Sequence, residues 1–205
     1  MSEQVRATVC VYCGSNVGTD PAYGATARAL GAALAGRGLR LVYGGGNVGL
    51  MGVLADAALA GGGEVVGVIP ETLRRAEVAH QGLTELEIVG SMHERKARMA
   101  SLADGFIALP GGFGTFDEVI EMLTWSQLGL QERSVVFLDV GGFFDPLLAM
   151  FDRARDAGFV RSSHRMLARR ARSVDEAIAL ALAPAPVTPH KWLDRDRDVA
   201  NGPGT

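Results

Sequence analysis

Short apolar runs alternate along the chain with longer segments that have the apolar spacing of amphipathic helices. Runs bounded by glycine or polar residues are typical of buried strands, and we expect strands at 7–12, 39–43, 65–69, 86–89, 105–109 and 135–138. Helices are predicted between them, at 22–35, up to about 60, from 91, from 118, at 145–157 and at 174–182. This alternation predicts an α/β fold, a Rossmann-like doubly wound parallel sheet with helices on both faces.

One predicted turn is rich in glycine. The run at 105–109 is followed by Pro-Gly-Gly-Phe-Gly-Thr at 110–115 and then by a segment with helical spacing. Glycines let the backbone approach a ligand, and the free N–H groups and dipole of a helix start favour an anion, most often phosphate. Glu118 and Glu121 lie one turn apart on one face of that helix. The sequence thus predicts a phosphate site with carboxylates beyond it, although such turns also occur without a ligand and such acids can merely complement the dipole.

A second glycine-rich turn follows the predicted strand at 39–43. Gly44, Gly46 and Gly49 satisfy the G-x-G-x-x-G pattern of dinucleotide-binding turns, and Glu71 falls near the position of a ribose-binding acid. That pattern is weak on its own, and here it follows the second strand of the chain rather than the first. A dinucleotide site is therefore the alternative to a mononucleotide site.

Basic residues stand near the start of the helix predicted from 91. Ser91 and Glu94 form a capping-box pattern, which places Arg95 and Lys96 in the first turns of this helix. Cations there oppose the helix dipole. We therefore expect an anion to compensate them, either a bound phosphate or the two carboxylates beyond the glycine-rich turn, with a solvated basic face as the alternative.

All of these segments follow strands of a predicted parallel sheet, so they emerge at its carboxyl edge, where α/β folds bind ligands. The polar turn after the first strand, which contains Ser15, emerges there too. One cleft can therefore collect that serine, both glycine-rich turns, the basic pair and the two glutamates. A nucleoside 5'-monophosphate, with its dianionic phosphate, ribose diol and base, suits this set of donors and acceptors.

Composition narrows the class of protein. A length of 205 residues fits one domain with a good core, which we place at 1–183 as a single nucleotide-binding domain, followed by a flexible, proline-containing and charged tail at 184–205. The net charge of −3 argues against a nucleic-acid or membrane-surface binder. The amino end lacks a signal-peptide pattern and no apolar run reaches membrane length. We therefore expect a cytoplasmic protein.

Two further groups of residues are interpreted as structural. Cys10 and Cys13 form C-x-x-C, but Cys10 lies inside an apolar run and the four histidines lack metal-like spacing. We therefore expect buried cysteines and no metal site. Five arginines between 161 and 172 lie close together, and with an acidic overall balance they favour a solvated helix face over a nucleic-acid surface.

Four stretches carry a more specific signal. They read P-G-G-x-G-T-x-x-E at 110–118, M-H-x-R-K at 92–96, G-G-G-x-x-G-L-M-G at 44–52 and W-x-Q-L-G at 125–129. Together they resemble the Lonely guy family, the cytokinin riboside 5'-monophosphate phosphoribohydrolases, which were long mislabelled as lysine decarboxylases. The resemblance extends over about residues 7–182. It implies hydrolysis of the N-glycosidic bond of nucleoside 5'-monophosphates without a cofactor, in a homodimer whose interface includes the W-x-Q-L-G helix.

The resemblance also implies roles for individual residues. The family assigns a catalytic role to the arginine of M-H-x-R-K, here Arg95, and we expect Glu118 or Glu121 to stabilise the positive charge that develops on the sugar. Asp117 stands where many relatives have glutamate. The expected substrate-binding residues are Ser15, Gly44, Gly45, Glu77, Arg95, Lys96, Gly111, Gly112, Gly114, Thr115, Asp117, Glu118 and Thr124.

Two other functions stay open on the sequence alone. A decarboxylase that uses pyridoxal phosphate needs a Schiff-base lysine, and Lys96 and Lys191 are the only lysines of the sequence. A non-catalytic sensor of AMP or a dinucleotide could use the same cleft. No stretch identifies the preferred base.

Overall fold

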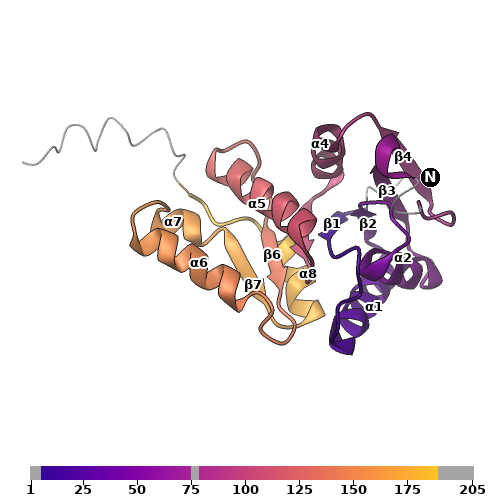
Figure 1. Ribbon diagram of the computed structural model, residues 1–205, viewed down its shortest axis with the longest axis horizontal. Helices are drawn as coiled ribbons and strands as arrows, with labels where there is room; N and C mark the ends of the chain where they lie inside the picture. The colour runs from indigo at the N-terminus through magenta and orange to yellow at the C-terminus, as the bar shows by residue number, and fades with distance from the viewer. Residues whose placement is uncertain (1–5, 75–78, 189–205) are drawn as a thin grey trace, which may run out of the picture.

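The computed structural model describes residues 6–74 and 79–188, which form one parallel sheet covered by helices on both faces (Figure 1). Within them, neighbouring strands pair in the order β4-β3-β2-β1-β5-β6-β7, and each pair is parallel. The strands are β1 (Thr8–Tyr12), β2 (Arg40–Tyr43), β3 (Val65–Pro70), β4 (Glu85–Val89), β5 (Gly105–Ala108), β6 (Val135–Leu138) and β7 (Ala168–Ala171). The helices are α1 (Pro21–Gly36), α2 (Gly49–Ala60), α3 (Glu71–Arg74), α4 (Met92–Leu102), α5 (Phe113–Gln127), α6 (Asp145–Asp156), α7 (Ser162–Arg165) and α8 (Val174–Leu182). The predicted fold class is confirmed.

The strand order reverses at β1, which pairs with β2 on one side and with β5 on the other. In doubly wound sheets the crevice for a ligand opens at this switch point, beyond the carboxyl ends of the strands. The turns after β1 and β5 meet there, because the amide of Gly14 donates to the carbonyl of Pro110 at 3.1 Å. The switch point therefore lies between the glycine-rich turn at 110–115 and the polar turn that contains Ser15.

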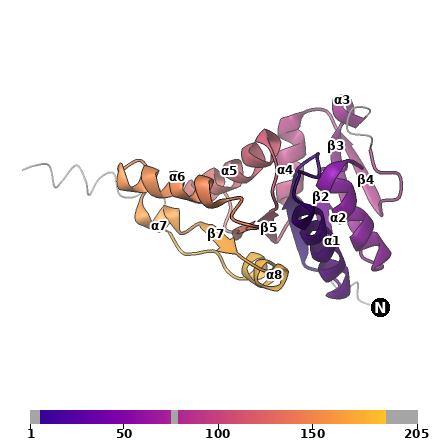
Figure 2. The ribbon, with the colours of Figure 1, turned by 60° about the horizontal axis from the view of Figure 1, so that its bottom comes forward.

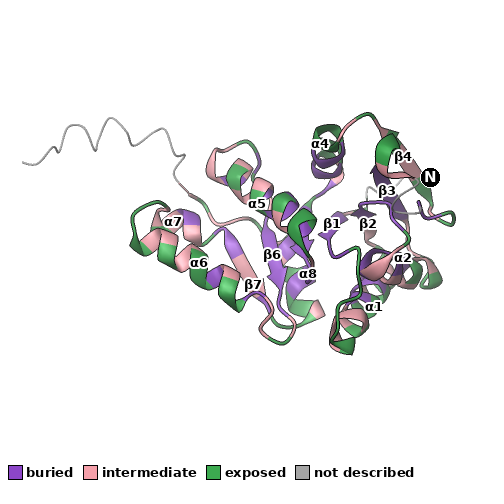
Figure 3. Ribbon diagram, viewed as in Figure 1, coloured by how far each residue is buried: buried purple, intermediate pink, exposed green. Residues whose placement is uncertain are grey.

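The helices form two layers (Figure 2). Buried side chains of α1, α2 and α8 pack on one face of the sheet, and those of α4, α5 and α6 pack on the other. Figure 3 shows the strands at the centre of the sheet as mostly buried, while the helices keep exposed residues on their outer sides. Burial on both faces explains why the strands read as continuous apolar runs rather than alternating ones.

Side chains alternate between the two faces of the sheet along β1, so the two cysteines point to opposite faces. Cys10 belongs to the apolar cluster on the α4–α5 side, whereas Cys13 belongs to the cluster on the α1–α2 side. Both are buried and free. The interpretation as structural cysteines is therefore confirmed.

Among the described helices, α1, α4 and α8 begin with a side-chain cap. The carboxylate of Asp20 accepts from the amide of Ala22 at 2.8 Å at the start of α1. Ser91 accepts from the amide of Glu94 at 3.2 Å at the start of α4, and Ser173 caps α8 in the same way. These bonds satisfy amides that the helix itself leaves open.

The prediction for the arginine-rich segment was wrong in part. The arginine-rich segment does not form a solvated helix face throughout, because Ala168–Ala171 is the edge strand β7, paired with β6. Arg169 donates to Ser134 Oγ at 3.0 Å, and Arg170 pairs with Asp139 and Asp145. Two half-buried arginines in a four-residue strand leave no apolar run to detect, so the strand is set by its neighbours rather than by its own composition.

The boundary between the domain and its tail remains a prediction. The last described helix, α8, ends at Leu182, and residues 189–205 lie outside the described part of the chain. The substrate-binding role expected for Glu77 also falls outside the described residues, since 75–78 are not among them.

Candidate active site

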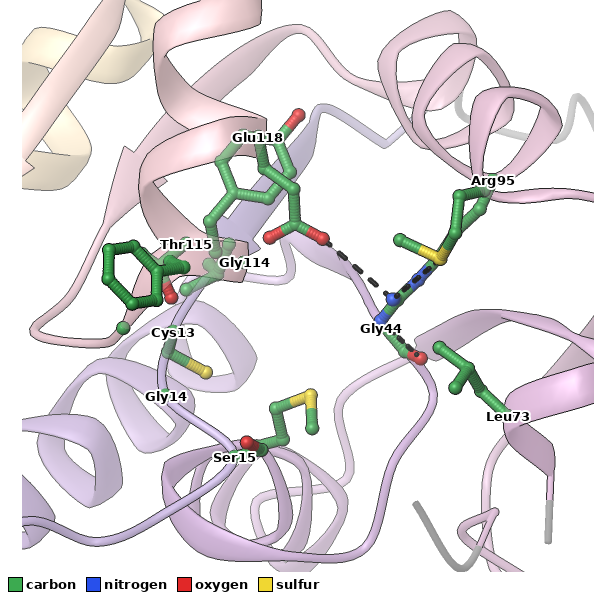
Figure 4. A pocket seen from close by; sticks show the side chains of 15 residues that line it. Cys13, Gly14, Ser15, Gly44, Leu73, Arg95, Gly114, Thr115 and Glu118 are labelled. Atoms are coloured by element: carbon green, nitrogen blue, oxygen red, sulfur yellow. Dashed lines mark hydrogen bonds and ion pairs between the residues drawn. The ribbon is translucent and has the colours of Figure 1, made fainter. Parts of the chain in front are cut away.

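A cavity of about 210 Å³ opens at the switch point, beyond the carboxyl ends of β1 and β5 (Figure 4). Its lining comes from the turn after β1, the turn after β2, the start of α4 and the start of α5. Seven of the expected residues line it: Ser15, Gly44, Arg95, Gly112, Gly114, Thr115 and Glu118. The sheet topology therefore brings together segments that are up to about a hundred residues apart in the sequence.

The start of α5 forms one wall of the cavity. Gly112 is the N-cap residue and has no side chain to offer the amides of Phe113, Gly114 and Thr115, which stand at the open start of the helix. Gly111 lies behind them, where a Cβ would fall 2.1 Å from Thr115 Oγ1. Only glycine permits that close approach, and it presents the helix start to the cavity.

Arg95 lies across the cavity from α5 and is buried, with 4% of its surface exposed. Its Nε donates to the carbonyl of Val68 at 3.1 Å, and its Nη2 donates to the carbonyl of Gly44 at 3.0 Å. Its Nη1 lies 4.0 Å from Oε1 of Glu118 (Figure 4). The contact at Gly44 requires glycine, because a Cβ there would fall 1.9 Å from Nη2.

Lys96 belongs to a separate ion cluster beside the cavity. Its Nζ lies 3.0 Å from Oδ2 of Asp117 and 3.2 Å from Oε2 of Glu121. Burial lowers the pKa of Lys96, but the hydrogen bonds to the two carboxylates outweigh burial, and the pKa is raised. Of the two carboxylates expected to compensate the cations of α4, Glu121 pairs with Lys96 and Glu118 lies near Arg95. Asp117, which was not expected in this role, also reaches the ammonium although it is shorter than glutamate.

The structure distinguishes Glu118 from Glu121, to which the sequence assigns the same role. Glu118 lines the cavity and is 8% exposed, whereas Glu121 points to Lys96 and does not line it. Successive turns of α5 thus place one carboxylate at the cavity and the other in the ion cluster.

Two other ionisable groups line the cavity, and both are held neutral. Burial raises the pKa of the Cys13 thiol well above its usual range, and the Glu118 carboxylate adds to this, although Arg95 opposes it. Burial likewise raises the pKa of Tyr12, followed by the influence of Cys10 and Glu118. A thiolate nucleophile is therefore not expected at this site.

The remaining expected residues lie outside the cavity. Gly45 turns away from it, since a Cβ there would approach Leu86 and Ile69. Thr124 lies further along α5, exposed, with its hydroxyl donating to the carbonyl of Ile120 at 2.9 Å. Gly111, Lys96, Asp117 and Glu121 adjoin the lining without belonging to it.

An apolar wall of the cavity was missed from sequence. It consists of Met51, Leu73 and Met92, together with Val11 and the side chain of Phe113, which is 93% exposed at the rim. Met51 and Met92 belong to two of the motifs, but methionine is most often a core residue, so its type alone carried no signal.

The second glycine-rich turn does not offer the phosphate site of a dinucleotide fold. The amide of Leu50, at the start of α2, donates to the carbonyl of Gly14 at 3.0 Å. A Cβ on Gly49 would fall 2.2 Å from the backbone of Ser15. The turn after β1 therefore covers the helix start that a pyrophosphate would occupy.

Among residues 6–74 and 79–188, no group of three or more His, Cys, Asp or Glu side chains is placed to hold a metal ion. In the same residues, no helix combines the length and the apolar character that crossing a bilayer requires.

Comparison with known proteins identifies the relatives of the chain. The family model described as "Possible lysine decarboxylase" matches residues 51–181. The chain is 48% identical over 188 residues, 90% of its length and 95% of the relative's, to the cytokinin riboside 5'-monophosphate phosphoribohydrolase of Rhodococcoides fascians. It is 50% identical over 159 residues, 78% of its length and 71% of the relative's, to a probable enzyme of the same description from Oryza sativa subsp. japonica.

Solved structures share the fold at lower sequence identity. The molybdenum cofactor binding protein of Rippkaea orientalis superposes with a TM-score of 0.65 at 21% identity, over 87% of this chain and 96% of that one. The Moco carrier protein of Chlamydomonas reinhardtii gives 0.63 at 23% identity, over 85% and 94%. At such identity the likeness concerns the fold alone.

Pyridoxal phosphate, which the description of the family model would imply, does not fit the described residues. A Schiff base requires a lysine that can lose its proton. Lys96 is the lysine of the described part, and two carboxylates hold its ammonium outside the cavity with a raised pKa. Sequence identity over nearly the whole length of a relative, the matching family model and the shared motifs together establish that this chain belongs to the Lonely guy family of cytokinin riboside 5'-monophosphate phosphoribohydrolases.

Proposed function

We propose that the protein hydrolyses the N-glycosidic bond of nucleoside 5'-monophosphates, including those of cytokinins, and releases the free base and ribose 5-phosphate. The observation that carries this proposal is the position of Glu118. It lies in the cavity, one helical turn beyond the open start of α5, and faces Arg95 across the cavity. The names of the relatives support the same reaction.

The phosphate binds at the start of α5 in this proposal. The amides of Gly112, Gly114 and Thr115 supply donors, and the helix dipole favours the negative charge. Gly112 and Gly114 are exposed at the cavity rim, so their backbone is accessible to a ligand. Binding energy from the phosphate holds the sugar in register for the bond cleavage.

Glu118 acts on the sugar. Cleavage of the N-glycosidic bond develops positive charge on C1' and the ring oxygen, as in glycoside hydrolysis. A carboxylate near C1' stabilises this charge, and it can orient or deprotonate the attacking water. The ion pair between Glu121 and Lys96 favours Glu118 as the residue in this role and leaves Glu121 to hold Lys96 in place.

Arg95 assists the departing base electrostatically. An arginine side chain is a poor proton donor at neutral pH, so the role of Arg95 is electrostatic. Two backbone carbonyls fix its orientation, so that Nη1 is directed toward Glu118. A fixed positive charge at this place stabilises negative charge that develops on the base as the bond breaks.

A panel of nucleoside 5'-monophosphates tests the proposal. We expect the purified protein to release free base and ribose 5-phosphate from AMP or isopentenyladenosine monophosphate, as measured by chromatography. The panel also ranks the bases, which the apolar wall of Met51, Leu73 and Met92 does not by itself distinguish. Tight AMP binding without any base release would instead support the nucleotide sensor and would contradict the proposed reaction.

We further propose that the chain works as a cytoplasmic homodimer built from single domains of residues 1–183. The exposed side of α5 is the surface we assign to the interface: Ile120 and Thr124 border an apolar groove of about 110 Å³ with Phe151 of α6 and Leu167. A homodimer is also the commonest oligomer. Light scattering should give twice the chain mass, and Ile120→Asp should shift it toward the monomer; a monomeric wild type would contradict the proposal.

A further inference from the structure

We propose that His80 is a positioning residue for this reaction, because it fixes the backbone turn that holds Arg95. The inference rests on the proposed function for its effect on turnover, although its structural part does not. His80 does not line the cavity. It lies in the segment between α3 and β4, and its side chain is 8% exposed.

Both ring nitrogens of His80 have partners. The amide of Gly82 donates to Nδ1 at 3.0 Å, so Nδ1 carries no proton. Nε2 therefore carries the proton and donates to Oδ1 of Asp56 at 2.9 Å. Asp56 belongs to α2, so the second bond joins the segment before β4 to the helix that follows the glycine-rich turn.

The backbone of His80 holds the turn itself. Its amide donates to the carbonyl of Gly45 at 3.0 Å, and the preceding residue, Ala79, forms an antiparallel bridge with Gly46. The hydroxyl of Tyr43 donates to the carbonyl of Gly46 at 3.1 Å. The turn at 44–46 is thus held by Tyr43 on one side and by His80 on the other. The position of His80 is fixed in turn by its hydrogen bond to Asp56.

The same turn carries the acceptor for Arg95. The carbonyl of Gly44 accepts from Nη2 at 3.0 Å, and the next carbonyl, that of Gly45, accepts from His80. Rotation of one peptide plane changes the direction of the adjacent one, because they share the Cα of Gly45, which has φ +77°. If His80 is lost, the carbonyl of Gly44 therefore moves. This carbonyl orients the guanidinium of Arg95, whose Nη1 lies 4.0 Å from Oε1 of Glu118.

A purely structural role predicts a different outcome. If His80 only stabilises its own loop, its loss lowers the melting temperature and leaves the chemical step intact at temperatures well below unfolding. If it positions Arg95, a group that acts in the transition state, turnover falls while KM changes little. Small misplacements of catalytic groups cost about tenfold to a hundredfold in rate.

The test compares His80→Ala, Asp56→Ala and the double variant with the wild type, using kcat and KM for AMP and the melting temperature. We expect each single variant to lower kcat about tenfold with KM within about twofold, and the double variant to lose no more than His80→Ala. His80→Gln, whose amide can reach Asp56, should recover part of kcat. Ser134→Ala is the matched control, because Ser134 is a buried residue that does not line the cavity, and its loss removes the hydrogen bonds to the carbonyl of Ala183 and from Arg169.

A measurement without turnover separates this inference from the proposed function. The Nε–H signal of Arg95 in a ¹⁵N-edited NMR spectrum, identified by its loss in Arg95→Lys, reports the bond to Val68. His80→Ala should shift or broaden this signal, and Ser134→Ala should not. The inference would be overturned if the Arg95 signal were unchanged in His80→Ala. It would also be overturned if His80→Ala and Ser134→Ala had the same kcat. If the wild type releases no base, the proposed reaction fails and the Arg95 signal alone decides.

Discussion

Two clusters of acidic and basic side chains lie at the carboxyl edge of the sheet, and of the two only the first contributes residues to the cavity at the switch point. In the first, Arg95 faces Glu118 while Lys96 pairs with Asp117 and Glu121. In the second, Arg170 of β7 pairs with Asp139, which follows β6, and with Asp145 at the start of α6. Both contain a carboxylate that is at most 10% exposed.

The clusters differ in what lies around their buried carboxylates. Asp139 accepts from the amide of Phe144 at 2.9 Å and from Arg170, so it fastens the turn between β6 and α6. Glu118 lies 4.0 Å from Arg95, beyond hydrogen-bonding distance, beside the open start of α5. Buried ion pairs are therefore a poor sign of function by themselves. A buried carboxylate that lines the cavity at the switch point of the sheet, as Glu118 does, is a better one.

The largest difference between the clusters should come from Glu118→Gln. Glutamine keeps the size of the side chain but removes the charge that stabilises the sugar cation, so kcat for AMP should fall at least about a hundredfold. Unchanged turnover would remove Glu118 from the mechanism. Asp139→Asn, in the second cluster, provides the matched carboxylate-to-amide control and should leave kcat within about twofold, since it touches no substrate.

Lys96→Met should have an intermediate effect. Without the ammonium, the carboxylates of Asp117 and Glu121 repel one another. The ion pairs of Lys96 that join α4 to α5 are also lost, and with them a constraint on the position of Arg95 relative to Glu118. We expect kcat/KM for AMP to fall about tenfold, as for a small misplacement of catalytic groups. Lys96→Arg keeps the charge and should lose less. Equal losses for both variants would mean that the charge of Lys96 is not what matters.

Arg170→Met should have the smallest effect on activity and a visible one on stability. It leaves the carboxylate of Asp139, which is 4% exposed, without its cation. Discounting for the 30% exposure of Arg170, we expect a loss of about 1–2 kcal/mol, or roughly 2–8 °C in melting temperature. Calorimetry beside the AMP assay checks this. A tenfold loss of kcat would mean that the second cluster takes part in the reaction, and would contradict the difference in role between the two clusters.

Much of the fold could be predicted because the central strands are buried on both faces and therefore consist of continuous apolar runs. The strand β6 (Val135–Leu138) and the helix α8 (Val174–Leu182) have the bounds that their sequences indicate. The strand β7 could not be found in this way, because Arg169 and Arg170 are accommodated by partners from distant segments, such as Ser134 and Asp139. Tertiary contacts there override local pattern.

The sequence indicated seven residues that the fold brings to one cavity, but it could not show which of the expected residues lie outside that cavity. Periodicity places Glu118 and Glu121 on one face of α5, but only the packed position of α4 shows that Lys96 binds Glu121 and leaves Glu118 at the cavity. The helical period likewise cannot show that Thr124 lies outside the cavity. Such distinctions depend on where a second element packs, which a single sequence does not contain.

A crystal structure of Glu118→Gln with bound AMP tests the central claim most directly, because the variant should bind the nucleotide and cleave it slowly. We predict phosphate oxygens about 3 Å from the amides of Gly112, Gly114 and Thr115, with C1' of the ribose beside the side chain of residue 118. A phosphate bound away from the start of α5, or a residue 118 turned away from the sugar, would contradict the account.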